Sequence, residues 1–353
     1  MATSGTYNAV TFPVWKLLEK AAQRCSKPLA ELTAENIQTA IDEFNLMFAE
    51  YANRGLKLWA IEETYVPLYY GRRDYPLDEN TIDVLNDPQL RTPSRATDSG
   101  GTATSSAGGT VEYAFDGDLE TACTQVSPGG NIKYDFVTEV ILTYIGILPN
   151  ATGTLALNIE ASMDDVNWQV IKQLDSATYT NEVWVWFPLN ETGSYRYWRL
   201  RERSTGTLDL RELYLSSTYT DVSLPRFSRD SYSNMPNKNL LSRPTQYWWD
   251  RERVQPVMVL WPVPNQQFWS LYVMRKRMLQ DVTAIAQDVE CPRRWWNALV
   301  EGLAKRLVRC GVGDPARLAD IDPALKDALF LAENEEQDSG EVTMIPNLRG
   351  YSR

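Results

Sequence analysis

The chain has 353 residues, 43% of them hydrophobic, a formal net charge of −11 and no histidine. This length allows a sizeable core and one to three domains. The absence of histidine removes the commonest general base and the commonest transition-metal ligand. The excess of acidic residues disfavours tight binding of a DNA duplex, because such binding needs Lys and Arg to displace counterions.

The N-terminal part is predicted to contain two helices followed by strands. Apolar residues three and four apart predict helices over 11–25 and 33–53, with Thr33 as a cap of the second. Alternating residues then predict a strand over 56–68 and a short strand at 82–85. Residues 1–10 are polar and are expected to form an extended arm.

The composition changes near residue 92. Residues 92–110 are rich in Ser, Thr, Gly and Ala, which predicts a linker. Short β-prone runs then follow one another to residue 217, a pattern typical of an all-β sandwich. The expected strands are 132–136, 140–147, 155–162, 168–172, 183–187, 195–201 and 208–215. Residues 98–217 contain 16 acidic and 7 basic residues, a net charge of −9.

The region that organises the remainder of the chain is 243–309. Its β-rich runs between 243 and 274 predict a meander, in which Pro262 and Pro264 either end the second strand or place it on an edge of the sheet. A strong helix is then expected from Pro292, with Glu301 and Lys305 paired on its outer face. The apolar face of this helix would be formed by Trp295, Trp296, Leu299, Val300, Leu303 and Leu307. Two short helices, after Asp314 and Asp322, and an extended tail over 340–353 complete the prediction.

The chain carries no recognisable catalytic pattern, so it is predicted not to be an enzyme. We identify no glycine-rich phosphate loop, nucleophile elbow or metal cluster. Cys25, Cys123, Cys291 and Cys310 lack CxxC spacing, which predicts reduced, buried thiols rather than disulfides or a zinc site. No signal peptide, transit peptide or membrane-spanning run is recognised, and no membrane partner is expected.

The two outer segments, about 10–90 and 220–335, resemble the head-to-tail adaptor proteins of tailed phages, including the tail accessory factors of short-tailed phages. The motifs that carry this resemblance are 44–48, 55–59, 75–77, 82–85, 228–232, 237–238, 243–247 and 260–264. The resemblance implies a helical bundle with a small β-region. It also implies that copies form a ring matching the twelve-fold symmetry of the portal.

The middle segment resembles a discoidin, or F5/8 type C, galactose-binding-like module. The motifs are 103–106 for the first strand, 114–121 for the Asp-Gly loop, 162–168 for the Ser-x-Asp-x-x-x-Trp turn, 196–200 and 212–215 for late strands. Asp165 stands where glycine is usual, and the flanking cysteine pair common in secreted members is absent. The resemblance implies a jelly-roll sandwich whose members bind ligands through variable loops.

Two readings stay open for the Asp-Gly loop. The discoidin resemblance implies that Asp116, Asp118, Thr121 and Glu212 form a structural calcium site, since calcium prefers hard oxygen ligands. Alternatively, the loop is a turn that needs only Asp hydrogen bonds and a Gly backbone. No loop carries an obvious aromatic platform for a sugar. Trp184 and Trp186 alternate along one strand and are interpreted as packing residues.

The helix after Pro292 supplies the candidate interface residues. Its basic side chains would form either a solvated face or a contact with an acidic surface of the portal. Its two tryptophans are interpreted as core and subunit contacts rather than nucleic-acid stackers. The interface candidates are Arg293, Arg294, Trp295, Trp296, Lys305, Arg306 and Arg309.

The sequence therefore predicts an α+β chain. A helical-bundle adaptor domain with a small β-region, 1–95 and 218–339, would be interrupted by an all-β jelly-roll sandwich, 96–217. The expected role is that of a virion structural protein of the neck, made in the host cytoplasm, that joins head to tail and helps to retain packaged DNA. Its partners would be portal protein, neighbouring copies in a ring, tail nozzle or fibre proteins, and passing DNA without sequence readout. The alternative is a carbohydrate-binding protein with a discoidin-like module. Structural calcium is the one cofactor considered.

Overall fold

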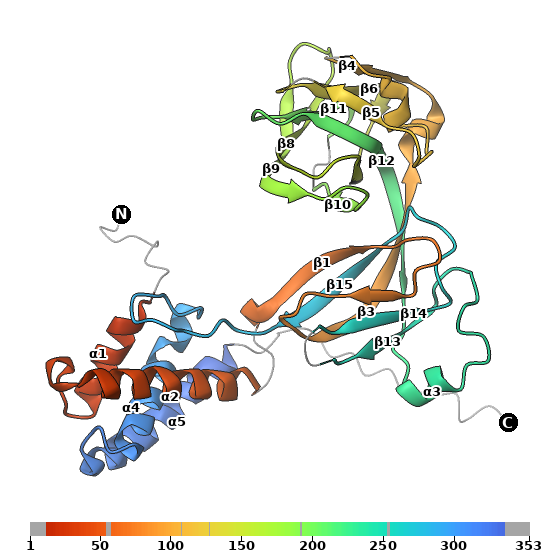
Figure 1. The fold of residues 1–353 in the computed structure, drawn as a ribbon. Coiled ribbons are helices and arrows are strands. Elements are labelled where there is room, and N and C mark those ends of the chain that lie inside the picture. Colours follow the sequence, from red (N-terminus) through yellow and green to blue (C-terminus); the bar gives the residue numbers. More distant parts are fainter. Residues whose placement is uncertain are drawn as a thin grey trace. The chain divides into compact units, whose positions relative to one another are not determined.

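The computed structural model describes residues 12–53, 58–106, 108–126, 128–190, 193–252 and 255–335. The chain divides into two compact units (Figure 1): Met1–Glu62 with Arg277–Arg353, and Glu63–Lys276. The described part of the first unit is mostly helical, and the second is mostly β. The predicted sandwich boundaries, at 95/96 and 217/218, both fall inside the second unit. No helix of the described chain is long and apolar enough to cross a membrane.

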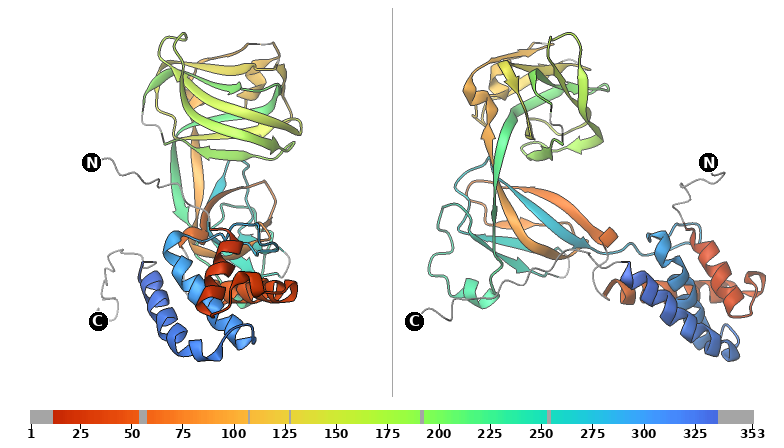
Figure 2. Two further views of the ribbon diagram at one scale, coloured as in Figure 1. Left: turned by 90° about the vertical axis from the view of Figure 1, so that its left-hand side faces the viewer. Right: turned by 180° about the vertical axis from the view of Figure 1, so that it is seen from behind.

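Four helices of the first unit share one core and lie together in both views of Figure 2. They are α1 (Val14–Arg24), α2 (Ala34–Asn53), α4 (Trp296–Arg309) and α5 (Leu318–Asn334). Single 3-10 turns lie at Leu29–Glu31, Leu58–Ala60, Arg293–Trp295 and Pro315–Arg317. The predicted cap of α2 is confirmed, because the Thr33 hydroxyl accepts a hydrogen bond from the Asn36 N–H at 3.2 Å.

Two element predictions in this unit were wrong. Leu58–Ala60 forms a 3-10 turn and not the start of a strand, since Trp59 packs against Trp295 of the helical core, 5.8 Å between ring centroids. Residues 56 and 57 lie outside the described residues. The two short helices expected near the C-terminus are one helix, α5, which continues through Pro323. Its buried side chains hold it on the core despite the backbone hydrogen bond that proline cannot make.

The described residues of the second unit form three sheets. The strand order is β1-β15-β3-β12-β7-β10 in a seven-stranded sheet, where β5 also pairs with β12, β4-β6-β11-β8-β9 in a five-stranded sheet, and β13-β14-β2 in a three-stranded sheet. The strands are β1 (Ile61–Pro67), β2 (Asp74–Pro76), β3 (Thr81–Arg95), β4 (Thr102–Ser105), β5 (Cys123–Val126), β6 (Asn131–Val140), β7 (Tyr144–Pro149), β8 (Gly153–Ser162), β9 (Gln169–Tyr179), β10 (Val185–Pro188), β11 (Tyr195–Glu202), β12 (Leu208–Ser223), β13 (Gln246–Asp250), β14 (Val257–Trp261) and β15 (Ser270–Arg277). Short helical segments lie at Ala96–Ser99, Val111–Ala114 and α3 (Arg229–Ser233).

The predicted all-β sandwich is confirmed as a jelly-roll-like pair of sheets. The five-stranded sheet packs against β12, β7 and β10 of the seven-stranded sheet, and every strand expected between 132 and 215 is present. The core between the sheets takes alternate residues from each strand, such as Trp198 and Leu200 of β11 and Leu157 and Ile159 of β8.

Two long strands, β3 and β12, join the sandwich to the rest of the second unit. Arg95 of β3 pairs with Ser216 of β12, so the two ends of the sandwich segment lie side by side. The pairing continues to Gln89 and Ser223. The linker prediction for 92–110 was therefore wrong over the end of β3 and over β4. Composition resembled a linker there, but strand pairing on both sides orders the backbone.

The predicted meander between 243 and 274 was partly wrong. β13 and β14 pair antiparallel, and β14 ends at Trp261, directly before Pro262, as expected. β15, however, does not continue that sheet and lies between β1 and β3. The chain between β14 and β15 therefore crosses from the three-stranded sheet to the seven-stranded sheet, and β15 does not pair with β14.

An aromatic cluster lies between the sandwich and the strands β1 and β15 of the second unit. Trp184 and Trp186 are both buried, as predicted, and stack with their ring centroids 4.9 Å apart. Tyr144 lies in the same cluster, and its hydroxyl hydrogen bonds that of Ser270 in β15 at 2.9 Å. The cluster is completed by Leu148 and Tyr214, with Tyr65, Tyr69, Leu119 and Phe268 at its edge.

Candidate functional site

The predicted Asp-Gly loop is held by hydrogen bonds among its own residues. One oxygen of Asp116 accepts from the Asp118 N–H at 2.8 Å, and the other accepts from the Thr121 hydroxyl at 2.9 Å. Asp118 in turn accepts from the Glu120 N–H at 3.0 Å. Gly117 has a φ of 79°, a left-handed conformation that favours glycine. These contacts are those of a tight Asx-type turn.

Glu212 lies beneath this loop, fully buried, and faces Arg95. Its Oε1 forms an ion pair with the Arg95 guanidinium, and its Oε2 accepts from the Gly117 N–H at 3.1 Å. Arg95 also donates to the Phe115 carbonyl at 3.1 Å. The sequence placed Glu212 near the loop correctly, but it did not reveal Arg95 as the partner.

The calcium hypothesis finds a poor fit in this arrangement. Both oxygens of Glu212 and both oxygens of Asp116 already accept hydrogen bonds or pair with a cation. Within the described part of the chain, no group of three or more Asp, Glu, Cys or His side chains is arranged to hold a metal ion. Calcium binding stays a prediction, and the loop geometry favours the turn.

Addition of a calcium chelator is therefore expected to leave the melting temperature of the protein unchanged. Asp116→Ala should lower the melting temperature equally with and without chelator, because it removes two turn hydrogen bonds and no metal ligand. Differential scanning calorimetry measures both effects. A chelator-induced drop in the unsubstituted protein that disappears in Asp116→Ala would instead establish a calcium site.

The stability of the second unit should fall as pH rises toward 8. Burial raises the pKa of Glu212 from 4.5 to about 8, against the opposing effects of Arg95 and the Gly117 N–H. Between these values the folded state holds a proton that the unfolded state has lost, so stability declines as pH increases. Urea unfolding at pH 5 and pH 8 should show this decline. Glu212→Gln should flatten it, and an equal decline in that variant would assign it to another group.

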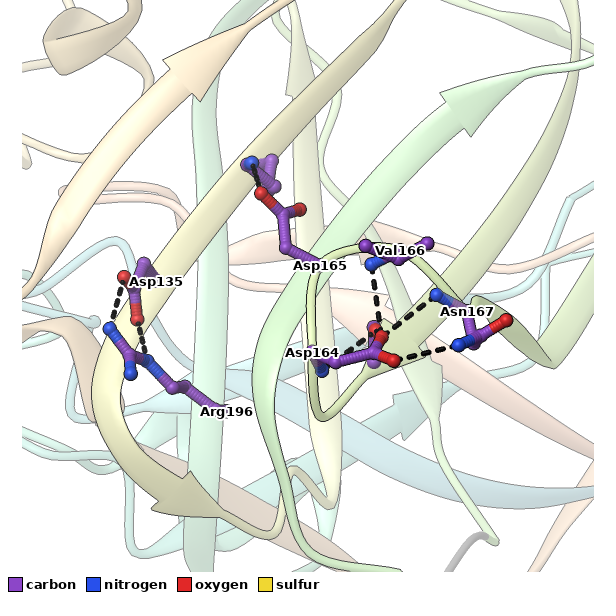
Figure 3. A network of polar contacts seen from close by, with 8 residues as sticks. Asp135, Asp164, Asp165, Val166, Asn167 and Arg196 are labelled. Carbon is purple, nitrogen blue, oxygen red and sulfur yellow. Dashed lines mark hydrogen bonds and ion pairs between the residues drawn. The ribbon is translucent and has the colours of Figure 1, made fainter.

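The Ser-x-Asp-x-x-x-Trp turn is organised around Asp164 (Figure 3). Its carboxylate accepts from the N–H groups of Asn167 and Val166 at 2.8 and 2.9 Å and from the Asn167 side chain at 2.7 Å. These hydrogen bonds hold the pKa of Asp164 well below its usual range, and the bond from the Asn167 N–H has the largest effect. The next residue, Asp165, points to β6 and pairs with Lys133 at 2.6 Å. The turn is thus tied to the outer face of the five-stranded sheet.

The outer face of that sheet carries a polar network that sequence reasoning missed. Figure 3 shows Arg196 facing Asp135, with two hydrogen bonds of 2.8 and 2.9 Å. Farther along the face, Arg199 donates to the buried Glu160 at 2.7 Å, and its guanidinium stacks on Trp168 at 3.8 Å from the ring centroid. The signal was present in the alternation of Arg199, Arg201 and Arg203 along the sequence, but the partners of these arginines come from other strands.

Among the predicted interface residues, some side chains belong to the helical core and others form ion pairs with neighbouring helices. Trp295 is buried against Tyr51 and Trp59, whereas Trp296 is half-buried and stacks on Phe12 at 4.5 Å. Arg293 lies over the Trp296 ring, and Arg294 lies over that of Trp59. The interface assignment itself stays a prediction.

The basic end of α4 is largely neutralised within its own unit. Arg306 donates to Glu43 and Glu50 of α2 at 2.9 and 2.7 Å. Lys305 pairs with Asp322 of α5 at 2.7 Å. These residues, with Arg309 and exposed Cys310, line a cleft of about 510 Å³ between α2, α4 and α5. Cys310 thus departs from the prediction of four buried thiols.

The expected pair of Glu301 with Lys305 was wrong. Glu301 is 4% exposed and pairs with Arg24 of α1 at 3.0 Å. Because α1 packs against α4, it covers the side of α4 that carries Glu301, which was predicted to face solvent. Burial raises the pKa of Glu301, with Arg24 opposing that shift.

No protein-family model and no curated protein matches this chain. Among solved structures, it is similar to a mutant of chitosan-binding module 1 from a Paenibacillus sp. IK-5 chitosanase/glucanase, with 16% identity, a TM-score of 0.31, and coverage of 35% of this chain and 99% of that chain. It is also similar to CBM62 of Clostridium thermocellum Xyl5A, with 17% identity, a TM-score of 0.30, and coverage of 34% and 96%. A third similar structure is CpGH89CBM32-5 from Clostridium perfringens, in complex with GalNAc-β-1,3-galactose. Its sequence identity is 16% and its TM-score is 0.31, and the match covers 35% of this chain and 99% of that chain. Values this low carry no inference about what this chain binds.

Proposed function

We propose that this chain is a structural protein of a phage virion, a head-to-tail adaptor that forms a ring below the portal. The supporting observation is that the segments on either side of the sandwich combine with each other. Helices α1 and α2 share a core with α4 and α5, and β1 and β3 are joined by β15. The two segments that resemble adaptors therefore both contribute to the helical core and both contribute strands to the seven-stranded sheet. This role requires no catalytic group.

A ring subunit must carry apolar surface that its neighbours or the portal can cover. Phe330 and Leu331 are adjacent on α5 and are each 64% exposed. Two large apolar side chains exposed on successive positions of one helix offer apolar surface that a neighbouring subunit or the portal could cover. We therefore assign α5 to the assembly surface of the adaptor.

The assembly surface can be tested with the portal protein of the same virion. The purified chain should bind portal in stoichiometric copies, and Phe330→Asp combined with Leu331→Asp should weaken that binding at least tenfold while leaving helical circular dichroism unchanged. Val170→Asp, at an exposed apolar position of the sandwich, is the matched control. Electron microscopy of virions labelled with an antibody to this chain should place the label at the neck. Label at any other place on the virion would refute the adaptor role.

A second candidate function is carbohydrate binding by the sandwich. The observation that favours it is the outer face of the five-stranded sheet, where Trp168 and Arg199 stack beside polar side chains of β8. Binding of oligosaccharides by the free chain, without portal, separates this candidate from a purely structural role.

A further inference from the structure

The basic residues of the acidic sandwich are concentrated on one sheet. Residues 98–217 contain seven Lys and Arg residues against 16 Asp and Glu. Five of the seven belong to β6, to β11 or to the position directly after it: Lys133, Arg196, Arg199, Arg201 and Arg203. Lys133, Arg196 and Arg199 are paired with Asp165, Asp135 and Glu160, whereas Arg201 makes only a long contact of 3.8 Å with Glu160.

Strand register places these cations among amides. Arg201 of β11 is directly opposite Asn131 of β6 and Asn158 of β8, and Asn158 is directly opposite Gln173 of β9. Directly opposed residues share one face of a sheet, so these four side chains form a row across four strands. Adjacent strands lie about 4.8 Å apart, which gives the row a length of roughly 14 Å.

Arg201 is the less completely paired of the two arginines that face Glu160. Arg199 donates to Glu160 at 2.7 Å and stacks on Trp168. Arg201 approaches the other oxygen of Glu160 at 3.8 Å, an oxygen that already accepts from the Asn158 side chain at 3.1 Å. The Arg201 side chain is also half-exposed. Its guanidinium can therefore accept a second anion without giving up a strong bond.

Asn158 provides an independent indication of a ligand. This residue is 8% exposed, and its side-chain oxygen Oδ1 has no hydrogen-bond partner among the described residues. A buried polar atom without a partner costs free energy that a ligand hydroxyl or a water could recover. The row therefore combines a half-exposed cation with a buried acceptor that lacks a partner, a pair of functions suited to an anionic molecule that also carries hydroxyl groups.

We propose that the row formed by Asn131, Arg201, Asn158 and Gln173 binds an acidic saccharide on the outer face of the five-stranded sheet. Arg201 pairs with the carboxylate of a uronate unit, and the three amides hydrogen bond its hydroxyls. Trp168 lies beside this row on the stacked Arg199. This inference rests on the carbohydrate-binding candidate and not on the adaptor role. The site lies on strands and not in the loop around Asp116.

The test is isothermal titration calorimetry of the full chain with a galacturonate trisaccharide, a neutral galactose trisaccharide and a triglutamate peptide. We expect the acidic saccharide to bind at least tenfold more tightly than either of the others. Arg201→Gln should weaken its binding about tenfold and leave binding of the neutral sugar unchanged. Added salt should reduce the affinity for the acidic saccharide alone.

Two further variants keep this test decisive. Gln173→Glu changes an exposed side chain in the row, so it should fold normally and still weaken binding of the acidic saccharide. Arg211→Gln removes a basic residue of the other sheet and should have no effect. Equal binding of the peptide would show a simple anion site. Tight binding of the neutral sugar alone would preserve carbohydrate binding and overturn the acidic ligand, and no binding of any saccharide would overturn both.

Discussion

Replacement of Trp295 by alanine is expected to destabilise the helical unit by about 3–5 kcal/mol, a typical cost for truncating a buried Trp. The Trp295 ring is buried in the core shared by the four helices and packs against Tyr51 and Trp59, with centroids 6.2 and 5.8 Å away. Alanine would leave a cavity that helices from both ends of the chain cannot fill without moving. Urea unfolding followed by circular dichroism at a helical wavelength measures the loss.

The neighbouring tryptophan supplies the matched control. Trp296 is half-buried and stacks on Phe12, so Trp296→Ala should cost clearly less than Trp295→Ala. The comparison also separates the two roles, core packing and subunit contact, that were predicted jointly for these residues. If both variants unfolded at the same urea concentration, the assignment of Trp295 to the core and Trp296 to its edge would be incorrect.

Replacement of Asp221 by alanine should destabilise the second unit by about 3 kcal/mol, because it leaves the buried Arg91 guanidinium without its partly exposed carboxylate partner. Arg91 of β3 is 5% exposed and forms two hydrogen bonds with Asp221 of β12, at 2.9 and 2.7 Å. Tyrosine rings surround the guanidinium, with its carbon 3.8 Å from the centroid of Tyr219. The other rings are those of Tyr65, Tyr144 and Tyr272. Without the carboxylate, the cation would be left buried among aromatic rings.

Asp175→Ala tests whether this effect comes from burial or from charge alone. The Asp175 side chain is 96% exposed and lies 3.9 Å from Arg203, a surface contact worth at most about 1 kcal/mol. Thermal unfolding followed by tryptophan fluorescence should therefore show a large decrease in midpoint for Asp221→Ala and almost none for Asp175→Ala. Similar decreases would mean that Arg91 does not depend on its carboxylate.

Where local chemistry decides the conformation, the sequence was sufficient. The cap at Thr33 and the end of β14 before Pro262 follow from hydrogen-bonding groups within a few residues. The strands of the sandwich follow from alternation along each run, because one face of every strand must be buried. A two-layered sandwich could likewise be anticipated from successive strands and the turns between them, whereas the jelly-roll arrangement was implied only by the resemblance to discoidin modules.

The partners of charged and aromatic residues were decided by the tertiary structure. Glu301 has Lys305 one helical turn away, yet it pairs with Arg24 because α1 covers that face. β15 leaves the expected meander to lie between β1 and β3. Arg201 and Asn158 are more than forty positions apart in the sequence and are brought together only by strand register. Sequence patterns report which side of an element is buried, whereas the identity of what buries it depends on long-range packing.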